Sequence, residues 1–242
     1  MAVVDTQRAA DGVTRLTLNR PDKANALNDD MVAALGEALA TATDDGTRLL
    51  VLSAEGKHFC AGFDLGDLEA RSDGDLVLRL VRIEQVMQAL YHMPFPTLAL
   101  ARGRAMGAGA DLFAACSQRV AAPGTQFRMP GLAFGVLLGT RRLAARIGTD
   151  ATRRIQNETR GFDATEAHAL GFASDVIEED DWPAMVNSAT TAANTLTAEA
   201  TAALFRATAA DTRVTDMADL VASAARPGLK GRIQAYRESL KR

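Results

Sequence analysis

The chain of 242 residues is poor in cysteine and histidine, and it has no G-x-S-x-G motif. Its two cysteines, Cys60 and Cys116, belong to no C-x-x-C pair, so no disulfide framework is expected. The three histidines form no H-E-x-x-H motif, and we predict no metal site. Without a nucleophile elbow, and with no serine in its glycine-rich turn, the chain is not a typical serine hydrolase.

Long uncharged hydrophobic runs are also missing. Charged residues interrupt every apolar stretch well before it could cross a bilayer. Asp5 and Arg8 stand where a signal peptide needs apolar residues, so none is expected. The net charge of −3 gives no reason to expect a nucleic acid or an anionic membrane as partner. These features predict a soluble cytoplasmic protein.

Short apolar runs alternate with helix-like stretches along residues 1–182. Strands are expected at 14–18, 49–52, 97–101 and 119–121, and helices follow Asn28 and run over 76–90, 141–147 and 164–170. The continuous apolar run Leu49–Leu52 indicates a strand buried on both faces. This alternation predicts an α/β fold with parallel strands. Residues 183–242 are alanine-rich helix formers with a break at Pro227–Gly228, a region too short for its own core.

Two segments, His58–Asp64 and Gly103–Asp111, carry most of the functional information. Each follows a strand-like run and leads through small residues towards a helix-like stretch. Small residues let a ligand approach the backbone and its N–H groups. Two such turns could hold one oxygen between two amides, as an oxyanion hole does. A dinucleotide loop is the rival interpretation, but Phe113 stands where the G-x-G-x-x-G order needs its last glycine.

The chain resembles the crotonase (enoyl-CoA hydratase/isomerase) superfamily over nearly its whole length. The similar segments, in order, are Arg20–Leu27, Phe59–Leu65, Gly103–Cys116, Gly161–Ala173 and Arg226–Arg232. The resemblance implies a crotonase-type spiral of repeated ββα units. It also implies a C-terminal helical region, 183–242, that assembles a homotrimer or a dimer of trimers.

Site residues follow from the same resemblance. It places the two oxyanion-hole amides on Phe63 and Ala108. The Ala61 carbonyl would meet the adenine amino group of coenzyme A, and Lys23 could face a phosphate. The remaining residues that it assigns to substrate binding are Ala24, Gly62, Asp64, Leu65, Gly107 and Gly131. No separate cofactor is implied, because coenzyme A is part of the substrate.

The acid–base groups differ from those of hydratases, which carry two glutamates. Asp111 matches the first and is the candidate acid or base, although a structural role, paired with Arg104 or another neighbour, is the alternative. Gly131 stands where the second glutamate would be. Hydration normally needs two carboxylates, so the two-glutamate mechanism is not expected.

We therefore expect an enoyl-CoA hydratase/isomerase-family enzyme that binds an acyl-CoA thioester and stabilises its enolate. Two alternatives stay open. One is a non-catalytic acyl-CoA-binding homologue, and the other is a CoA-thioester isomerase or hydrolase that uses a different carboxylate.

Overall fold

A six-stranded sheet forms the centre of the protein, which we describe for residues 2–240 from a computed structural model. The strands lie in the order β1-β2-β3-β4-β6-β9, and every neighbouring pair is parallel except β1 and β2. Their bounds are β1 Val4–Arg8, β2 Val13–Leu18, β3 Leu49–Ala54, β4 Thr97–Ala101, β6 Gln118–Ala121 and β9 Asp175–Val176. The predicted α/β fold with parallel strands is thus confirmed.

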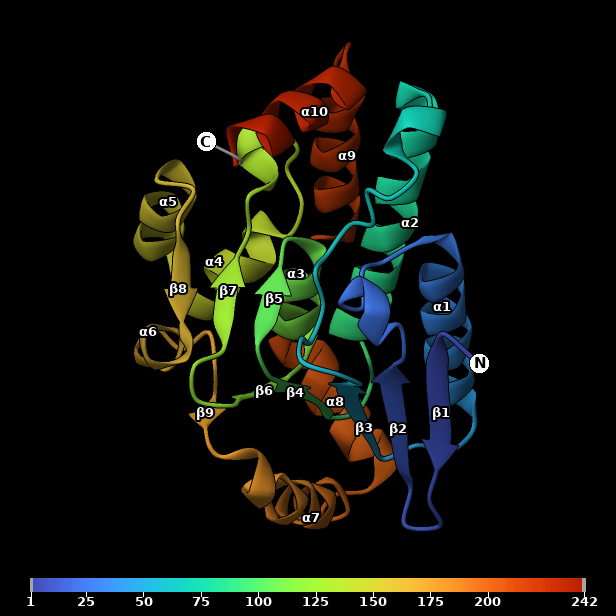
Figure 1. The fold of residues 1–242 in the computed structure, drawn as a ribbon. Helices are drawn as coiled ribbons and strands as arrows, with labels where there is room; N and C mark the ends of the chain where they lie inside the picture. The colour runs from blue at the N-terminus through green and yellow to red at the C-terminus, as the bar shows by residue number, and fades with distance from the viewer. Residues whose placement is uncertain (1, 241–242) are drawn as a thin grey trace.

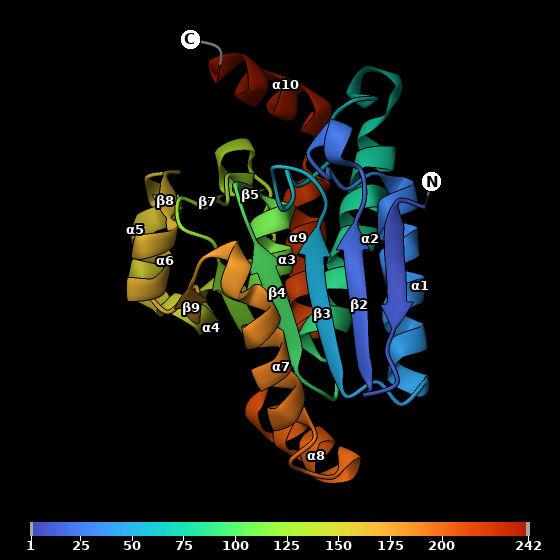
Figure 2. The ribbon, with the colours of Figure 1, turned by 60° about the horizontal axis from the view of Figure 1, so that its bottom comes forward.

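Helices cover both faces of this sheet. In Figure 2, α1 (Asp29–Asp44), α2 (Asp73–Tyr91), α3 (Ala108–Ala115) and α9 (Arg213–Ala224) lie behind the strands. Helix α7 (Trp182–Ala193) crosses in front of them. Along β3, Leu50 and Leu52 join one hydrophobic cluster, whereas Leu49 and Val51 join the cluster that includes α7. The strand is buried on both faces, as its continuous apolar run predicted.

A second, three-stranded sheet was not predicted, because its strands are too short to show a pattern. It has the order β5-β7-β8, with β5 Arg104–Met106, β7 Gln126–Arg128 and β8 Gly161–Asp163. Phe127 of β7 packs on Phe113 of α3 with ring centroids 4.9 Å apart. This contact packs the small sheet against α3, the helix that begins within the second glycine-rich segment. Helices α4 (Thr140–Ile147), α5 (Thr149–Asn157) and α6 (Ala164–Ala169) surround it.

The C-terminal helices separate into two groups rather than forming one layer. Helices α7 and α8 (Ala198–Thr208) lie at one end of the molecule, and α9 and α10 (Leu229–Ser239) reach the other end, near the tips of β5 and β7 (Figure 1). The predicted break at Pro227–Gly228 is confirmed, because α10 begins directly after Gly228. No helix within residues 2–240 combines the length and hydrophobicity that a membrane crossing requires.

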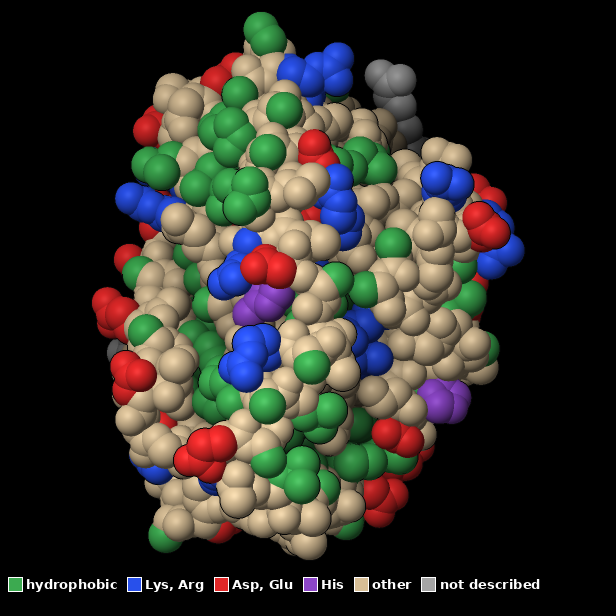
Figure 3. All heavy atoms as spheres, turned by 180° about the vertical axis from the view of Figure 1, so that it is seen from behind, with side chains coloured by type: hydrophobic (Ala, Val, Ile, Leu, Met, Phe, Trp, Pro, Cys, Tyr) green, Lys and Arg blue, Asp and Glu red, His purple; other side chains and the backbone are tan. Residues whose placement is uncertain are grey.

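Groups of hydrophobic side chains lie on the surface opposite to the view of Figure 1 (Figure 3). Large exposed hydrophobic residues occur on α8 and α9, among them Leu204, Val214 and Val221. The structure contains a single chain, so the predicted trimer stays a prediction.

Candidate functional site

The two glycine-rich segments lie against each other. Cys60 and Ala105 form a parallel β-bridge, and the Met106 amide donates a 2.9 Å hydrogen bond to the Cys60 carbonyl. A Cβ atom on Gly109 would lie 2.2 Å from that carbonyl oxygen, so only glycine fits there. The approach of the two segments is therefore set by the backbone itself.

Gly62 brings the first segment beside the start of α3. Its φ of +85° is in the left-handed region, and a Cβ atom there would lie 3.2 Å from the Ala108 amide nitrogen. The expected path from strand through turn to helix holds for the second segment, where Ala108 is the first residue of α3. The first segment differs, because β3 ends at Ala54 and a short 3₁₀ helix, Leu68–Ala70, precedes α2.

The amides of Phe63 and Ala108 have no acceptor among residues 2–240. Their neighbours are bonded: the Asp64 amide donates to Leu27, and the Gly107 amide donates to the Arg128 carbonyl at 2.7 Å. Ala108 also opens a helix, whose N-terminus carries partial positive charge. Two free amides on adjoining segments form an arrangement that can bind a carbonyl oxygen or an oxyanion.

A mostly apolar cavity of about 260 Å³ adjoins these amides. Of the residues predicted for the site, it is lined by Ala61, Phe63, Leu65, Gly107, Ala108 and Gly131. Its far wall comes from α2, the loop after β7 and α10, through Leu80, Phe134, Val136, Leu138 and Ile233. No carboxylate is among the described residues that line it. The cavity can enclose an apolar group next to the two amides.

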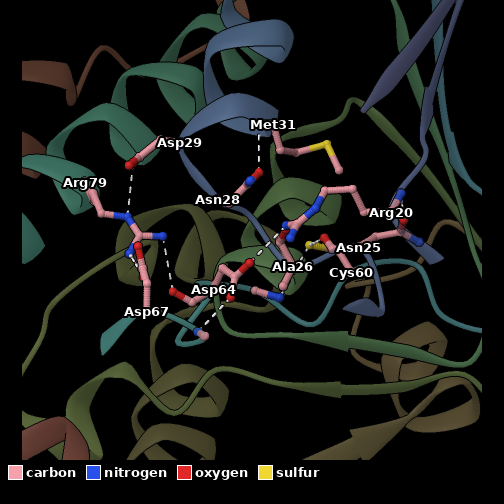
Figure 4. Close-up of polar contacts among 12 residues, drawn as sticks. Arg20, Asn25, Ala26, Asn28, Asp29, Met31, Cys60, Asp64, Asp67 and Arg79 are labelled. Atoms are coloured by element: carbon pink, nitrogen blue, oxygen red, sulfur yellow. Dashed lines mark hydrogen bonds and ion pairs between the residues drawn. The ribbon is translucent and has the colours of Figure 1, made fainter. Parts of the chain in front are cut away.

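Two arginines hold the backbone that follows the first turn (Figure 4). Arg20 Nη1 donates to the Ala26 carbonyl at 2.6 Å and to Asp64 Oδ2 at 3.0 Å. Arg79, on α2, donates to the Asp64 carbonyl at 3.2 Å and stacks on the Phe63 ring, 4.7 Å from its centroid. Both arginines thereby hold Asp64, the residue that follows Phe63.

The residues predicted to contact the nucleotide and pantetheine lie on the other side of the first segment. The Ala24 carbonyl accepts a 2.9 Å hydrogen bond from the Ala61 amide. Lys23 is exposed and lines a polar groove together with Arg20 and Asp64. Asp64 faces this groove and Arg20 rather than lining the apolar cavity. The first segment thus has a charged groove on one side and an apolar cavity on the other.

Asp111 is fully buried and does not line the cavity. Its partner is Arg142 of α4 rather than Arg104, at 2.8 Å from Nε to Oδ1 and 2.7 Å from Nη2 to Oδ2. Arg142 also binds Glu84 of α2, with Nη1 2.9 Å from Oε1. Burial alone would lower the pKa of Arg142, but the charges of Asp111 and Glu84 hold it well above its usual value. An acid–base role for Asp111 stays a prediction, and it requires this ion pair to open.

The ion pair between Arg142 and Glu84 was not predicted from the sequence. A signal for Glu84 existed, because it stands four residues after Leu80 and three before Met87, on the apolar face of α2. A charged residue at such a position needs a buried partner. No pattern in the sequence indicates which arginine supplies it.

Gly131 lies in the cavity wall, where the resemblance expects a second glutamate. A Cβ atom on Gly131 would lie only 2.8 Å from the Val136 carbonyl oxygen. The Val136 amide in turn donates to the Gly131 carbonyl at 2.9 Å. The backbone of Val136 therefore occupies the space that a side chain at residue 131 would need.

Cys60 is the one thiol in the two segments, and it is unsuited to nucleophilic catalysis. Burial raises the pKa of its thiol to about 12. Its Sγ donates to the Asn25 carbonyl, 3.1 Å away. The thiol is therefore protonated and engaged near neutral pH.

The chain is similar to proteins of one family in sequence and in structure. Residues 8–238 match the family model described as enoyl-CoA hydratase/isomerase. A probable enoyl-CoA hydratase of Mycobacterium leprae is 35% identical over 173 residues, which are 68% of this chain and 68% of that protein. A crystal structure of an enoyl-CoA hydratase/isomerase from Bordetella parapertussis is 43% identical, with a TM-score of 0.96 over 98% of both chains. An enoyl-CoA hydratase structure from Mycobacterium smegmatis is 29% identical, with a TM-score of 0.79 over 99% of this chain and 97% of that one.

Proposed function

Because this chain belongs to the enoyl-CoA hydratase/isomerase family, we propose that it binds an acyl-CoA thioester and polarises its carbonyl. The carbonyl oxygen would accept hydrogen bonds from the amides of Phe63 and Ala108. The observation that carries this proposal is that both amides lack an acceptor within residues 2–240 and belong to residues that line one cavity. The acyl chain would enter the apolar cavity, and the coenzyme A phosphates would lie towards Lys23.

The two amides would also stabilise an enolate. Removing a proton from the α-carbon moves negative charge onto the thioester oxygen, where preorganised donors act most strongly. Each donor typically lowers such a barrier by roughly 3 kcal/mol. Because Arg20 and Arg79 already hold the turn, little reorganisation would accompany the reaction.

Thermal unfolding tests binding. A ligand that binds only the native state raises the melting temperature, so acyl-CoA esters should raise it. Free fatty acid should raise it much less, because it lacks the nucleotide. Equal stabilisation by NADH, or no stabilisation by any CoA ester, would contradict the proposal.

Binding without turnover is the second candidate function. It is favoured because no carboxylate lines the described cavity and Asp111 is held by Arg142. Incubation of the native protein with crotonyl-CoA separates the two candidates. Hydration or proton exchange that is lost in Asp111→Asn supports an enzyme whose ion pair opens, since loss of a general base costs about a hundredfold or more. Tight binding with no exchange supports the binder.

Assembly into a homotrimer or a dimer of trimers remains part of this proposal. It is supported by the exposed hydrophobic residues on α8 and α9. Light scattering of the full chain should give three or six times the 25.6 kDa chain mass. The mass of a monomer would contradict it.

A further inference from the structure

Among the described residues that line the cavity, Arg128 is the only charged one. Its Nε donates to the Thr159 carbonyl at 2.8 Å, which fixes the guanidinium group. Within residues 2–240, neither of its terminal nitrogens has a hydrogen-bond acceptor, and it forms no ion pair. Arg20, Arg79 and Arg142 differ from it, because each has a carboxylate partner.

Arg128 is half-buried, and its side chain lies beside apolar residues of the cavity, where an ion pair is stronger than in open water. Arginine is also the side chain that binds planar carboxylates best, through two parallel N–H groups. The two unbonded nitrogens of Arg128 are the pair that such a contact uses. An anionic group of a ligand that enters the cavity can therefore pair with these two nitrogens.

Arg128 lies close to the proposed carbonyl-binding site along the chain fold. Arg128 ends β7 and lies opposite Met106 of β5 in the sheet register. Its own carbonyl accepts the amide of Gly107, the residue before Ala108. Neighbouring strands are about 4.8 Å apart, so the Arg128 backbone lies within roughly one strand spacing of the carbonyl-binding turn. Arg128 and the two amide-bearing residues line one cavity of about 260 Å³, so only a short acyl group fits between them.

A phosphate of coenzyme A is the other anion to consider. Lys23, which is expected to face a phosphate, lines the charged groove with Arg20 and Asp64. Arg128 instead shares its cavity with Leu80, Phe134 and Ile233. This environment fits an acyl group with a terminal carboxylate better than a hydrated phosphate.

We propose that Arg128 selects acyl-CoA thioesters whose short acyl group ends in a carboxylate. This inference rests on the proposed function, the binding of an acyl-CoA thioester. Such ligands are half-thioesters of dicarboxylic acids. Arg128 would bind the distal carboxylate while Phe63 and Ala108 bind the thioester oxygen. This makes Arg128 a specificity-determining residue.

Calorimetric titration of the intact protein tests this with two esters of equal carbon number, glutaryl-CoA and pentanoyl-CoA, and with free coenzyme A. The native protein should bind glutaryl-CoA at least tenfold more tightly than pentanoyl-CoA. Arg128→Met should remove this preference, whereas Arg128→Lys should keep part of it. Arg104→Met is the matched control, since Arg104 is exposed on the neighbouring strand and does not line the cavity. It should leave both affinities unchanged.

The titrations separate a failure of the Arg128 proposal from a failure of the proposed function. Equal affinity of the native protein for the two esters overturns the selection by Arg128 and leaves the proposed function intact. This comparison needs no variant, so it holds even if Arg128→Met fails to fold. Equal weakening of free coenzyme A and both esters in Arg128→Met assigns Arg128 to a phosphate and also overturns it. Binding of no ester at all overturns the proposed function itself.

Discussion

Arg142 holds both carboxylate oxygens of Asp111, with Nε 2.8 Å from Oδ1 and Nη2 2.7 Å from Oδ2. The same guanidinium binds Glu84, and at most 3% of the surface of any of the three side chains is exposed. Two carboxylates therefore share one buried cation. Asp111, which the family resemblance predicts as the candidate acid or base, is thus part of a buried ion network between α2, α3 and α4.

Replacing Arg142 should strongly destabilise the protein. Arg142→Met leaves Asp111 and Glu84 buried without a cation, and breaking a buried ion pair in this way costs about 3–5 kcal/mol. Arg141→Met is the matched control. Arg141 is 39% exposed and pairs with Asp216 and Asp219 at the surface, where such pairs contribute about 0–1 kcal/mol. Urea unfolding measures both, and equal losses would show that the buried network is not the stabilising element.

Ala108→Pro should remove one of the two carbonyl-binding donors while keeping the fold. Proline is favoured at the first position of a helix, which is the position of Ala108 in α3. The lost hydrogen bond is worth about 1 kcal/mol or more, so acyl-CoA affinity should fall about fivefold or more. Affinity for free coenzyme A, which has no thioester carbonyl, should not change. A folded variant with native acyl-CoA affinity would exclude Ala108 from the site.

The attachment of α10 should weaken at acid pH. Asp73 accepts hydrogen bonds from the amides of Gly228, Leu229 and Lys230, at 2.9, 3.1 and 2.8 Å. These bonds, the one from Lys230 foremost, lower the pKa of Asp73 below its ordinary 3.8. A lowered pKa in the folded state means that the stabilisation is complete above 3.8 and is lost as pH falls through the folded value.

Limited proteolysis with an acid protease can follow this loss. Cleavage within α10 of the native protein should increase as the pH falls below 3.8. Asp73→Asn, which has no carboxylate to protonate, should be cleaved there at pH 5 as well. Similar resistance of the two proteins at pH 5 would show that Asp73 does not hold α10.

Local patterns in the sequence were enough to predict the main elements. Asn28 caps α1 by accepting the Met31 amide at 3.0 Å, as the run from Asn28 to Asp30 indicated. Leu49–Leu52 lies in a strand buried on both faces, as its continuous apolar character predicted. These features depend on neighbours along the chain, so a single sequence contains them.

Long-range contacts could not be predicted in the same way. Asp111 and Arg142 are 31 residues apart, and only the folded α3 and α4 bring them together. The strands β5, β7 and β8 have three residues each, too few for an alternating pattern, so Arg128 had no visible place in the cavity wall. The family resemblance supplied the candidate amides, whereas their lack of acceptors is a property of the three-dimensional structure.

The proposed function depends above all on the amides of Phe63 and Ala108 binding the thioester oxygen. Calorimetric comparison of butyryl-CoA with S-butyl-CoA tests it most directly, since the thioether differs from the thioester only in lacking the carbonyl oxygen. Two hydrogen bonds to that oxygen, each worth about 1 kcal/mol, predict that butyryl-CoA binds at least tenfold more tightly. Equal affinities of the two compounds would show that these amides do not bind the carbonyl oxygen.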